Sequence, residues 1–148
     1  MLFSINHPNL SVLKETQTFY TADHEWICFA DNGAYVGVCG FKLTGIRKIE
    51  NIRLFVSGNN DIVTEGTPML QLCYKDYIIV VHAPIDCRLL AVGNVITDGM
   101  WEDIIAQPEG RGWLFKIIPA TPCNHSLISR KAYEERLVPF FDNSKLIF

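Results

Sequence analysis

The sequence predicts a mainly β domain, a sandwich or flattened barrel of short strands with a few short helices. Apolar residues recur at every second position in several short runs, which is the spacing of side chains that share one face of a strand. Clusters of turn-forming residues separate these runs, for example Asp31-Asn32-Gly33 and the stretch 57–61. Many short strands joined by such turns are typical of sandwiches and barrels.

Size and composition favour a single globular domain. The chain has 148 residues, of which 49% are hydrophobic and 20% are charged, as in an ordinary globular protein. No linker or low-complexity tract divides it, and its longest apolar run is only long enough for a strand. A membrane-spanning helix needs about 18 or more apolar residues, so we expect no membrane association.

The charge pattern gives no reason to expect binding to nucleic acid. The formal net charge is −3, which does not attract polyanions or acidic membranes in general. Four basic residues do cluster beside Glu50, but at mixed spacing: Lys42, Arg47, Lys48 and Arg53. We interpret them as a solvated edge.

Cysteine usage favours a reducing compartment. The five cysteines are odd in number and widely spaced, without a CxxC pair, so they predict neither a disulfide framework nor a zinc site. Residues 1–19 contain one lysine, no arginine and no cleavable apolar core, unlike a signal or transit peptide. We expect a cytoplasmic protein.

The first half of the chain predicts a hairpin, a helix and a strand. Strands at 26–30 and 34–39 are joined by the turn at Asp31-Asn32-Gly33. Residues 41–49 suit one short helix, although Gly45 within it costs about 1 kcal/mol relative to alanine. Residues 52–56 form the next predicted strand.

A second hairpin, between Gly66 and Pro84, is the strongest local pattern. Two runs of alternating apolar residues flank the two polar residues Lys75-Asp76, which is the signature of an antiparallel hairpin with a tight turn. The predicted cross-strand pairs are Tyr74 with Tyr77, Leu72 with Ile79, and Leu70 with Val81. Each pair contributes roughly 0.2–1 kcal/mol. The hairpin therefore presents Lys75 at its tip.

The second half predicts two more strands and two more helices. The strands are 88–92, followed by a turn at Gly93-Asn94, and 113–118. Asp98 can cap a helix over about 100–106, and Ser129 can cap one over 130–137.

Both ends of the chain differ in character from the middle. We divide the chain into an N-terminal arm (1–19), one domain (20–137) and a C-terminal tail (138–148). The tail is unusually apolar and either packs back on the domain or is buried against another copy. Packing back is the interpretation we favour.

Several segments of the sequence match one family in order and with near-family spacing. They are Tyr20-Thr21-Ala22-Asp23-His24-Glu25-Trp26, Tyr35-Val36-Gly37-Val38 with Phe41, Glu65-Gly66-Thr67-Pro68, Ala83-Pro84-Ile85, Gly112-Trp113-Leu114-Phe115-Lys116-Ile117-Ile118-Pro119 and Ala132-Tyr133-Glu134. On these motifs, the chain resembles the H protein of the glycine cleavage system, a lipoyl carrier. The resemblance covers about residues 20–137.

The resemblance implies a fold, a cofactor and a role. The fold is a barrel-sandwich hybrid of the lipoyl-domain type, with a helix near the C-terminus. A lysine at the hairpin tip would carry lipoate in amide linkage and shuttle an aminomethyl group, so the protein would be a carrier and not an enzyme. The implied partners are glycine decarboxylase, aminomethyltransferase, dihydrolipoamide dehydrogenase and a lipoate ligase or transferase.

The tip itself departs from the family pattern. The family reads roughly Glu-Ser-Val-Lys-Ala, where this chain has Cys73-Tyr74-Lys75-Asp76-Tyr77. Counted without gaps, the family lysine falls on Asp76, so Lys75 stands one residue early, and the acid usually found three residues before the lysine is missing. Lys75 is nevertheless the predicted attachment point. Tyr74, Asp76 and Tyr77 are predicted partner contacts, because tyrosine is favoured at interfaces.

Other interpretations remain open at this stage. A divergent paralogue could keep the fold without the cofactor and act as a binding or regulatory module through the same tip. A biotin carrier is excluded because its Met-Lys-Met tip is absent. A metal site built from Cys73, His82 and Cys87 is conceivable, but their spacing does not favour it, and we expect no metal. His24 is expected to have a structural hydrogen-bonding role.

Overall fold

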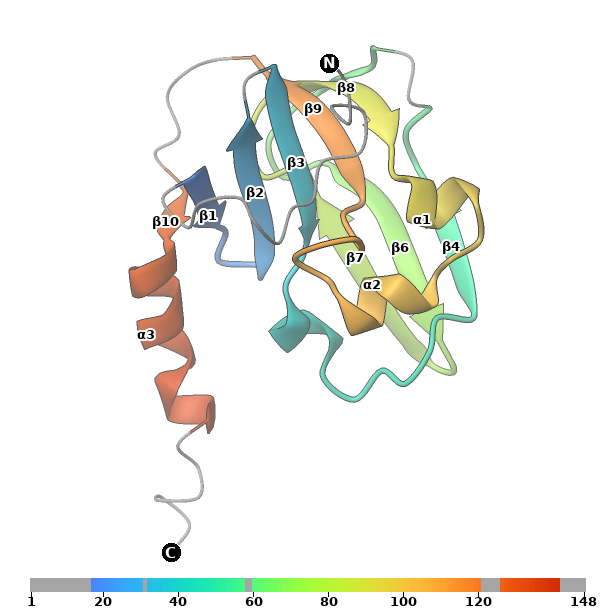
Figure 1. Cartoon of the computed structure of the whole chain (residues 1–148), viewed down its shortest axis with the longest axis vertical. Coiled ribbons are helices and arrows are strands. Elements are labelled where there is room, and N and C mark those ends of the chain that lie inside the picture. The colour runs from blue at the N-terminus through green and yellow to red at the C-terminus, as the bar shows by residue number, and fades with distance from the viewer. Residues whose placement is uncertain (1–16, 31, 58–59, 121–125, 142–148) are drawn as a thin grey trace, which may run out of the picture.

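The computed structural model describes residues 17–30, 32–57, 60–120 and 126–141, and Figure 1 shows them as two antiparallel sheets with a few short helices. The larger sheet has the order β10-β1-β2-β3-β9-β8-β5, with β10 (Ile128–Ser129), β1 (Thr18–Tyr20), β2 (Glu25–Ala30), β3 (Gly33–Val38), β9 (Phe115–Pro119), β8 (Cys87–Val92) and β5 (Ile62–Val63). The smaller sheet has the order β4-β6-β7, with β4 (Asn51–Leu54), β6 (Pro68–Tyr74) and β7 (Tyr77–His82). The predicted mainly β barrel-sandwich fold is confirmed.

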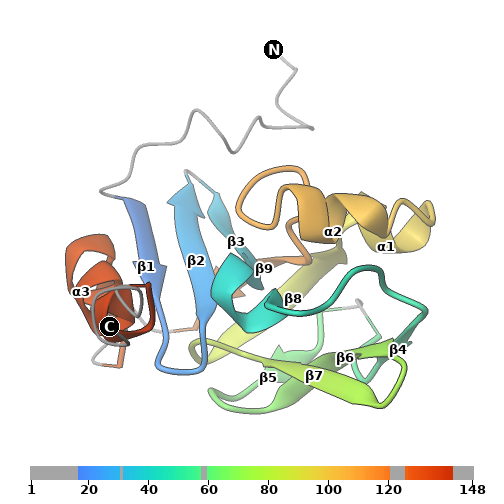
Figure 2. The same ribbon diagram turned by 90° about the horizontal axis from the view of Figure 1, so that it is seen from below.

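The helices lie at the ends of the sheets. Figure 2 shows α3 (Arg130–Phe141) beside β1, while α1 (Asn94–Thr97) and α2 (Glu102–Ala106) lie at the opposite end of the molecule. A 3-10 turn, η4 (Gly40–Leu43), lies in the connection between the two sheets. Among the described residues, no helix is both long and apolar enough to cross a bilayer.

The core fills the space between the two sheets. Its fully buried side chains come from both sheets and from α2, and include Ile27, Leu70, Leu72, Leu89, Ile104, Phe115 and Ile117. A second cluster lies under α3 and is rich in aromatic residues: Tyr20, Trp26, Cys28, Tyr35, Cys39, Tyr133 and Leu137. The alternation read from the sequence therefore corresponds to inward-facing strand positions.

The two hairpins are the most accurate sequence predictions. β6 and β7 pair with Tyr74 opposite Tyr77, Leu72 opposite Ile79 and Leu70 opposite Val81, as predicted. In the first hairpin, Ala30 of β2 is opposite Gly33 of β3. Local alternation and turn chemistry fix such short-range pairings.

The predicted helix at 41–49 is wrong beyond its first turn. The backbone is helical only in η4, and Gly45 has a φ of +87°, which a right-handed helix does not allow. Thr44 Oγ1 donates to the carbonyl of Phe41 at 2.7 Å, closing the turn. Ile46 and Ile49 are still buried as expected.

The helices of the second half also begin at different positions. The predicted turn at Gly93-Asn94 opens α1, a helix that the sequence pattern did not predict. Asp98 ends α1 instead of capping α2, because Gly99 has a φ of +73° and separates the two helices. For α3, the predicted cap is confirmed: Ser129 Oγ accepts the N–H of Ala132 at 3.2 Å.

The first strand and the last helix extend beyond the domain boundaries predicted from the sequence. β1 begins at Thr18, inside the predicted arm, and α3 continues to Phe141, inside the predicted tail. Phe140 contacts Phe41, with ring centroids 5.1 Å apart, so the first part of the tail does pack back. Residues 1–16 and 142–148 lie outside the described residues, and the division into arm, domain and tail remains a proposal.

Candidate functional site

Lys75 lies at the tip of the β6–β7 hairpin and is exposed. Of the two central turn residues, only Lys75 has a positive φ, of 53°, which is the pattern of a type II′ turn. Glycine is the usual residue there, and a left-handed conformation costs other residues about 1–2 kcal/mol. The strain indicates that neighbouring groups hold the turn in place.

Glu50, directly before β4, holds this turn. Its Oε1 accepts the backbone N–H of Lys75 at 2.8 Å, and its own N–H donates to the carbonyl of Cys73 at 2.8 Å. A hydrogen bond to a charged acceptor is stronger than one to a neutral acceptor, so this bond favours the strained conformation of Lys75. Glu50 stands 25 residues before Lys75, and no sequence motif identified it.

The tyrosines on either side of the turn differ in exposure. Their rings stack with centroids 6.5 Å apart and 9° between planes. Tyr74 is buried, whereas Tyr77 is 60% exposed. The Nζ of Lys75 lies 5.2 Å from the centroid of the Tyr74 ring, within the range of a cation–π contact. Tyr77 and Asp76 are accessible to a partner, and Tyr74 mainly supports the lysine.

The opposite end of the hairpin contains a buried carboxylate. Glu25 of β2 is 1% exposed, and its Oε2 accepts hydrogen bonds from Lys42 Nζ at 3.0 Å and from the N–H of His82 at 2.8 Å. The same oxygen lies 2.9 Å from His82 Nδ1. Oε1 accepts from Thr21 Oγ1 at 3.1 Å. Because Lys42 belongs to η4 and His82 to β7, Glu25 joins both sheets and the connecting turn.

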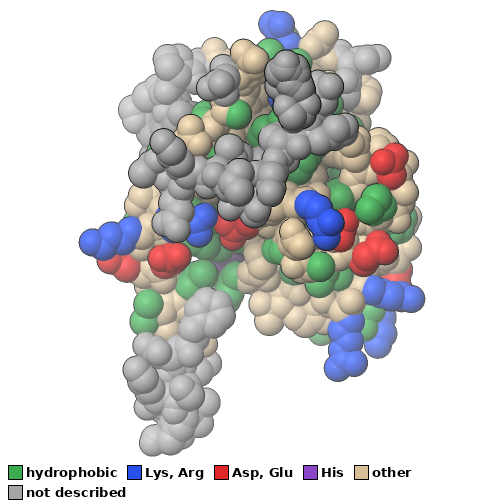
Figure 3. Space-filling model, in the orientation of Figure 1, with side chains coloured by type: hydrophobic (Ala, Val, Ile, Leu, Met, Phe, Trp, Pro, Cys, Tyr) green, Lys and Arg blue, Asp and Glu red, His purple; other side chains and the backbone are tan. Residues whose placement is uncertain are grey.

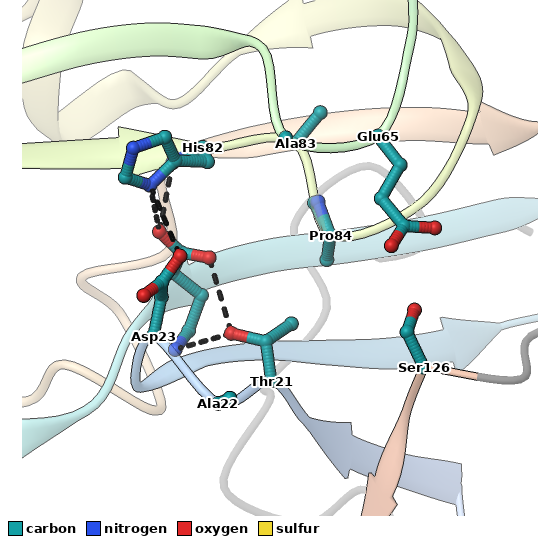
Figure 4. Close-up of a pocket in the computed structure, with 10 residues that line it drawn as sticks. Thr21, Ala22, Asp23, Glu65, His82, Ala83, Pro84 and Ser126 are labelled. Carbon is teal, nitrogen blue, oxygen red and sulfur yellow. Dashed lines mark hydrogen bonds and ion pairs between the residues drawn. The ribbon is translucent and has the colours of Figure 1, made fainter.

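A hollow of about 170 Å³ opens beside this carboxylate. Figure 4 shows Asp23 and Thr21 on one side of it, His82 and Pro84 above, and Glu65 and Ser126 at the far side. Asp23 Oδ2 is 3.8 Å from His82 Nδ1. The hollow is thus lined by the carboxylates of Asp23, Glu25 and Glu65 and by the imidazole of His82.

Asp23, Glu25 and His82 could in principle hold a metal ion, since their ligand atoms lie within 4.8 Å of one another. The Lys42 ammonium, however, already places a positive charge on Glu25 Oε2. A cation there would compete with it. We assign the cluster to an ion-pair network. The combination of Cys73, His82 and Cys87 considered from the sequence is not a cluster, because Cys73 is near the tip and His82 at the other end of β7.

His24 connects this region to α3. It has a φ of 66°, and its Nδ1 lies 2.9 Å from the hydroxyl of Tyr133, in agreement with the expected structural role. Burial, and then the nearby charge of Lys42, lowers the pKa of His24 below its usual value of 6.5. His24 therefore favours the neutral imidazole in the folded protein.

The cysteines are poor candidates for nucleophilic chemistry. The four in the described part of the chain are free, and three of them, Cys28, Cys39 and Cys87, are buried. Burial raises the pKa of Cys87 to about 11, and raises that of Cys39 further. The thiolate is the reactive form, so these two side chains are inert near neutral pH. Cys123 lies outside the described residues.

The charged side chains form no extended surface of one sign on the described part of the face in view. Figure 3 shows acidic and basic side chains next to one another there. This agrees with the low net charge of −3.

Comparison with known proteins finds relatives in one family. No family model matches the chain. The glycine cleavage system H protein of Thermobifida fusca is 29% identical over 98 residues, covering 66% of this chain and 75% of that protein. The H protein of Caulobacter vibrioides is 28% identical over 116 residues, covering 78% and 93%. That of Thermotoga maritima is 28% identical over 117 residues, covering 78% and 92%.

A solved structure supports the same relationship at the level of the fold. The crystal structure of a glycine cleavage system H protein from Mycobacterium marinum superposes with a TM-score of 0.70 and 22% sequence identity. The match covers 82% of this chain and 96% of that one. The fold of the described residues is therefore that of the H protein structure.

Proposed function

We propose that this chain, a distant homologue of the glycine cleavage system H proteins, is a lipoyl carrier that bears lipoate on Lys75. The observation that carries the proposal is the exposed lysine in the two-residue turn of a paired hairpin. In this role the protein is not an enzyme. Its arm would collect the aminomethyl group released by glycine decarboxylase and give it up to aminomethyltransferase, and dihydrolipoamide dehydrogenase would then oxidise the remaining dithiol back to the disulfide.

Attachment requires an accessible amine. When bound, lipoate supplies the dithiolane that carries the group. The Nζ of Lys75 would attack the carbonyl carbon of an activated lipoate, an acyl adenylate. The amide bond forms, AMP leaves with the bonding electron pair, and the amine loses a proton. Asp76 occupies the position that counting assigns to the family lysine, but a carboxylate cannot form this amide. Lys75 is the amine in the turn.

The protein would hold Lys75 in a fixed position and tether the group that the lysine carries. Three facing pairs stiffen the strands below the tip: Tyr74 with Tyr77, Leu72 with Ile79, and Leu70 with Val81. At the other end, the buried Glu25 ties His82 of β7 to β2. A tethered group on such a support is present at high effective concentration beside each partner. The free thiols of the described residues agree with action in a reducing cytoplasm.

A second candidate function is a protein-binding or regulatory module without lipoate. One observation favours it: the Lys75 ammonium lies back over the Tyr74 ring, while Tyr77 next to it is 60% exposed. An exposed aromatic ring at a rigid tip is a suitable anchor for a partner protein. In that case the tip would bind through Tyr77 and Asp76, without modification of Lys75.

Mass spectrometry separates the two functions. We would produce the full chain with a lipoate ligase in lipoate-supplied cells, and measure the intact protein and the peptide that contains Lys75. The carrier function predicts a lipoyl adduct on Lys75, lost in Lys75→Arg and kept in Lys48→Arg, a change at an exposed lysine outside the hairpin. Wholly unmodified Lys75 beside an active ligase would remove the carrier function and leave the binding module.

A further inference from the structure

Glu50 makes two hydrogen bonds with the hairpin tip, one through its side chain and one through its backbone. Its carboxylate accepts the N–H of Lys75, and its N–H donates to the carbonyl of Cys73, both at 2.8 Å. The next residue, Asn51, faces Cys73 across the β4–β6 pairing. Glu50 thus holds the end of β6 from the position directly before β4, and among the described side chains its carboxylate is the one from outside the hairpin that is bonded to the turn.

We propose that Glu50 is the positioning residue that makes Lys75, and not its neighbour, the side chain presented for acylation. This inference rests on the proposed carrier function. It adds that recognition of Lys75 depends on a carboxylate supplied from outside the hairpin. A modifying enzyme that reads the folded tip would encounter the turn in the conformation that Glu50 holds.

The backbone of the turn explains why such a residue is needed. Lys75 has a φ of 53° without being a glycine, so the turn is strained on its own. The two central residues are a lysine and an aspartate, adjacent in sequence. A one-residue change of register sends each side chain to the other face of the hairpin. Without the bond from Glu50, the turn can relax and Lys75 loses its fixed direction.

Glu50 takes no part in the chemical step. Its bonded atom contacts the backbone nitrogen of Lys75 and not Nζ. The amide bond still forms between Nζ and the acyl carbon of the adenylate, with loss of AMP and of a proton. Glu50 acts only through the geometry of the turn, so its effect must appear in the backbone as well as in the acylation rate.

The test uses the full chain with three substitutions. Glu50→Ala removes the acceptor, and Glu50→Gln keeps an acceptor oxygen without the charge. Asp86→Ala is the matched control, because Asp86 Oδ1 also accepts a backbone N–H. This hydrogen bond, from the N–H of Glu65, is 2.7 Å long and does not involve the tip. For each protein we would measure acylation by a lipoate ligase with lipoic acid and ATP, exchange of the Lys75 amide hydrogen, and the melting temperature.

The expected pattern is specific to the tip. Glu50→Ala should slow ligase-dependent acylation about tenfold and speed exchange of the Lys75 amide about tenfold, the effect of one lost charge-assisted hydrogen bond. Glu50→Gln should retain much of the acylation rate and of the protection of the Lys75 amide. Asp86→Ala should match the unchanged protein in both measurements. Acylation by acetyl N-hydroxysuccinimide should stay the same in all of them, because the Lys75 amine remains exposed.

Two results would overturn the inference, and a third concerns the proposed function. Wild-type acylation and amide protection in Glu50→Ala would show that Glu50 positions nothing. A loss of acylation in Glu50→Ala with unchanged amide exchange would show direct recognition of the carboxylate by the ligase instead. If the unchanged protein is not acylated at all, the carrier function fails, and the amide exchange still decides whether Glu50 holds the turn.

Discussion

The two ends of the β6–β7 hairpin are built on opposite principles. At the tip, Lys75 and Asp76 are exposed, and Glu50 is the one distant side chain bonded to the turn in the described structure. At the base, His82 is bonded to Glu25, which is 1% exposed and also bonded to Lys42 and Thr21. The tip is free to meet other molecules, whereas the base is fixed by several elements.

Under the proposed carrier function, the two ends of the hairpin have different tasks. A flexible arm delivers its cargo reliably only if its attachment point does not move, and the attachment point is stable only if the hairpin is held elsewhere. The contacts of the buried Glu25 at the base meet this need, since its ion pair with Lys42 and its hydrogen bonds with His82 connect β2, η4 and β7. We expect stability to depend on the base and modification to depend on the tip.

Removing the carboxylate at the base should have the largest effect. Glu25→Ala leaves the Lys42 ammonium and the N–H of His82 without their shared acceptor. Breaking a buried ion pair from one side costs about 3–5 kcal/mol. Urea unfolding should show a loss of this size. Glu65→Ala, at an exposed carboxylate of the same hollow, should change the unfolding free energy by less than about 0.5 kcal/mol. Equal effects of the two changes would contradict the comparison.

Removing the cation of the same pair should have an intermediate effect. Lys42→Met keeps most of the aliphatic stem but takes one donor from Glu25 Oε2, which retains its bond from the His82 N–H. We expect a loss of about 1–3 kcal/mol in urea unfolding, the range for a hydrogen bond to a charged group. Lys48→Met, at an exposed lysine, is the control. A stability gain in Lys42→Met would mean that burial of the ammonium is a net cost.

Acidification should weaken the base through His24. Because the pKa of His24 is lowered in the folded protein from its ordinary value of 6.5, the unfolded chain binds the proton more readily, and stability falls as the pH drops below 6.5. The side chain is only partly buried, so this loss should be smaller than the loss in Glu25→Ala. His24→Asn, which tolerates the positive φ, should flatten the difference in unfolding free energy between about pH 7.5 and pH 5.5. An unchanged pH dependence in this variant would assign the effect to other groups.

Changes at the tip should leave stability almost untouched. Asp76 is exposed in the turn, and substitutions at such positions usually stay within about 0.5 kcal/mol. Asp76→Ala should therefore match the unchanged protein in urea unfolding. The same variant can be used in binding measurements to test whether Asp76 contacts a partner. A loss above about 1 kcal/mol would show that the tip also supports the fold.

Much of the fold could be predicted from local patterns. The pairing of Tyr74 with Tyr77 and the cap at Ser129 depend on residues within a few positions of each other. Short-range alternation and hydrogen bonding decide such features without help from the rest of the chain. The helix predicted at 41–49 failed because Gly45 adopts a positive φ in its tertiary setting, and periodicity does not report backbone angles.

The sequence by itself determined that this is a β-rich domain with a lysine at a hairpin tip, because alternation and turn residues act locally. Only the tertiary structure decided what surrounds the two ends of that hairpin. Glu50 reaches the N–H of Lys75 from 25 residues away, and Glu25 reaches His82 from 57 residues away. Contacts of this separation depend on how the sheets close on each other. No local pattern encodes them.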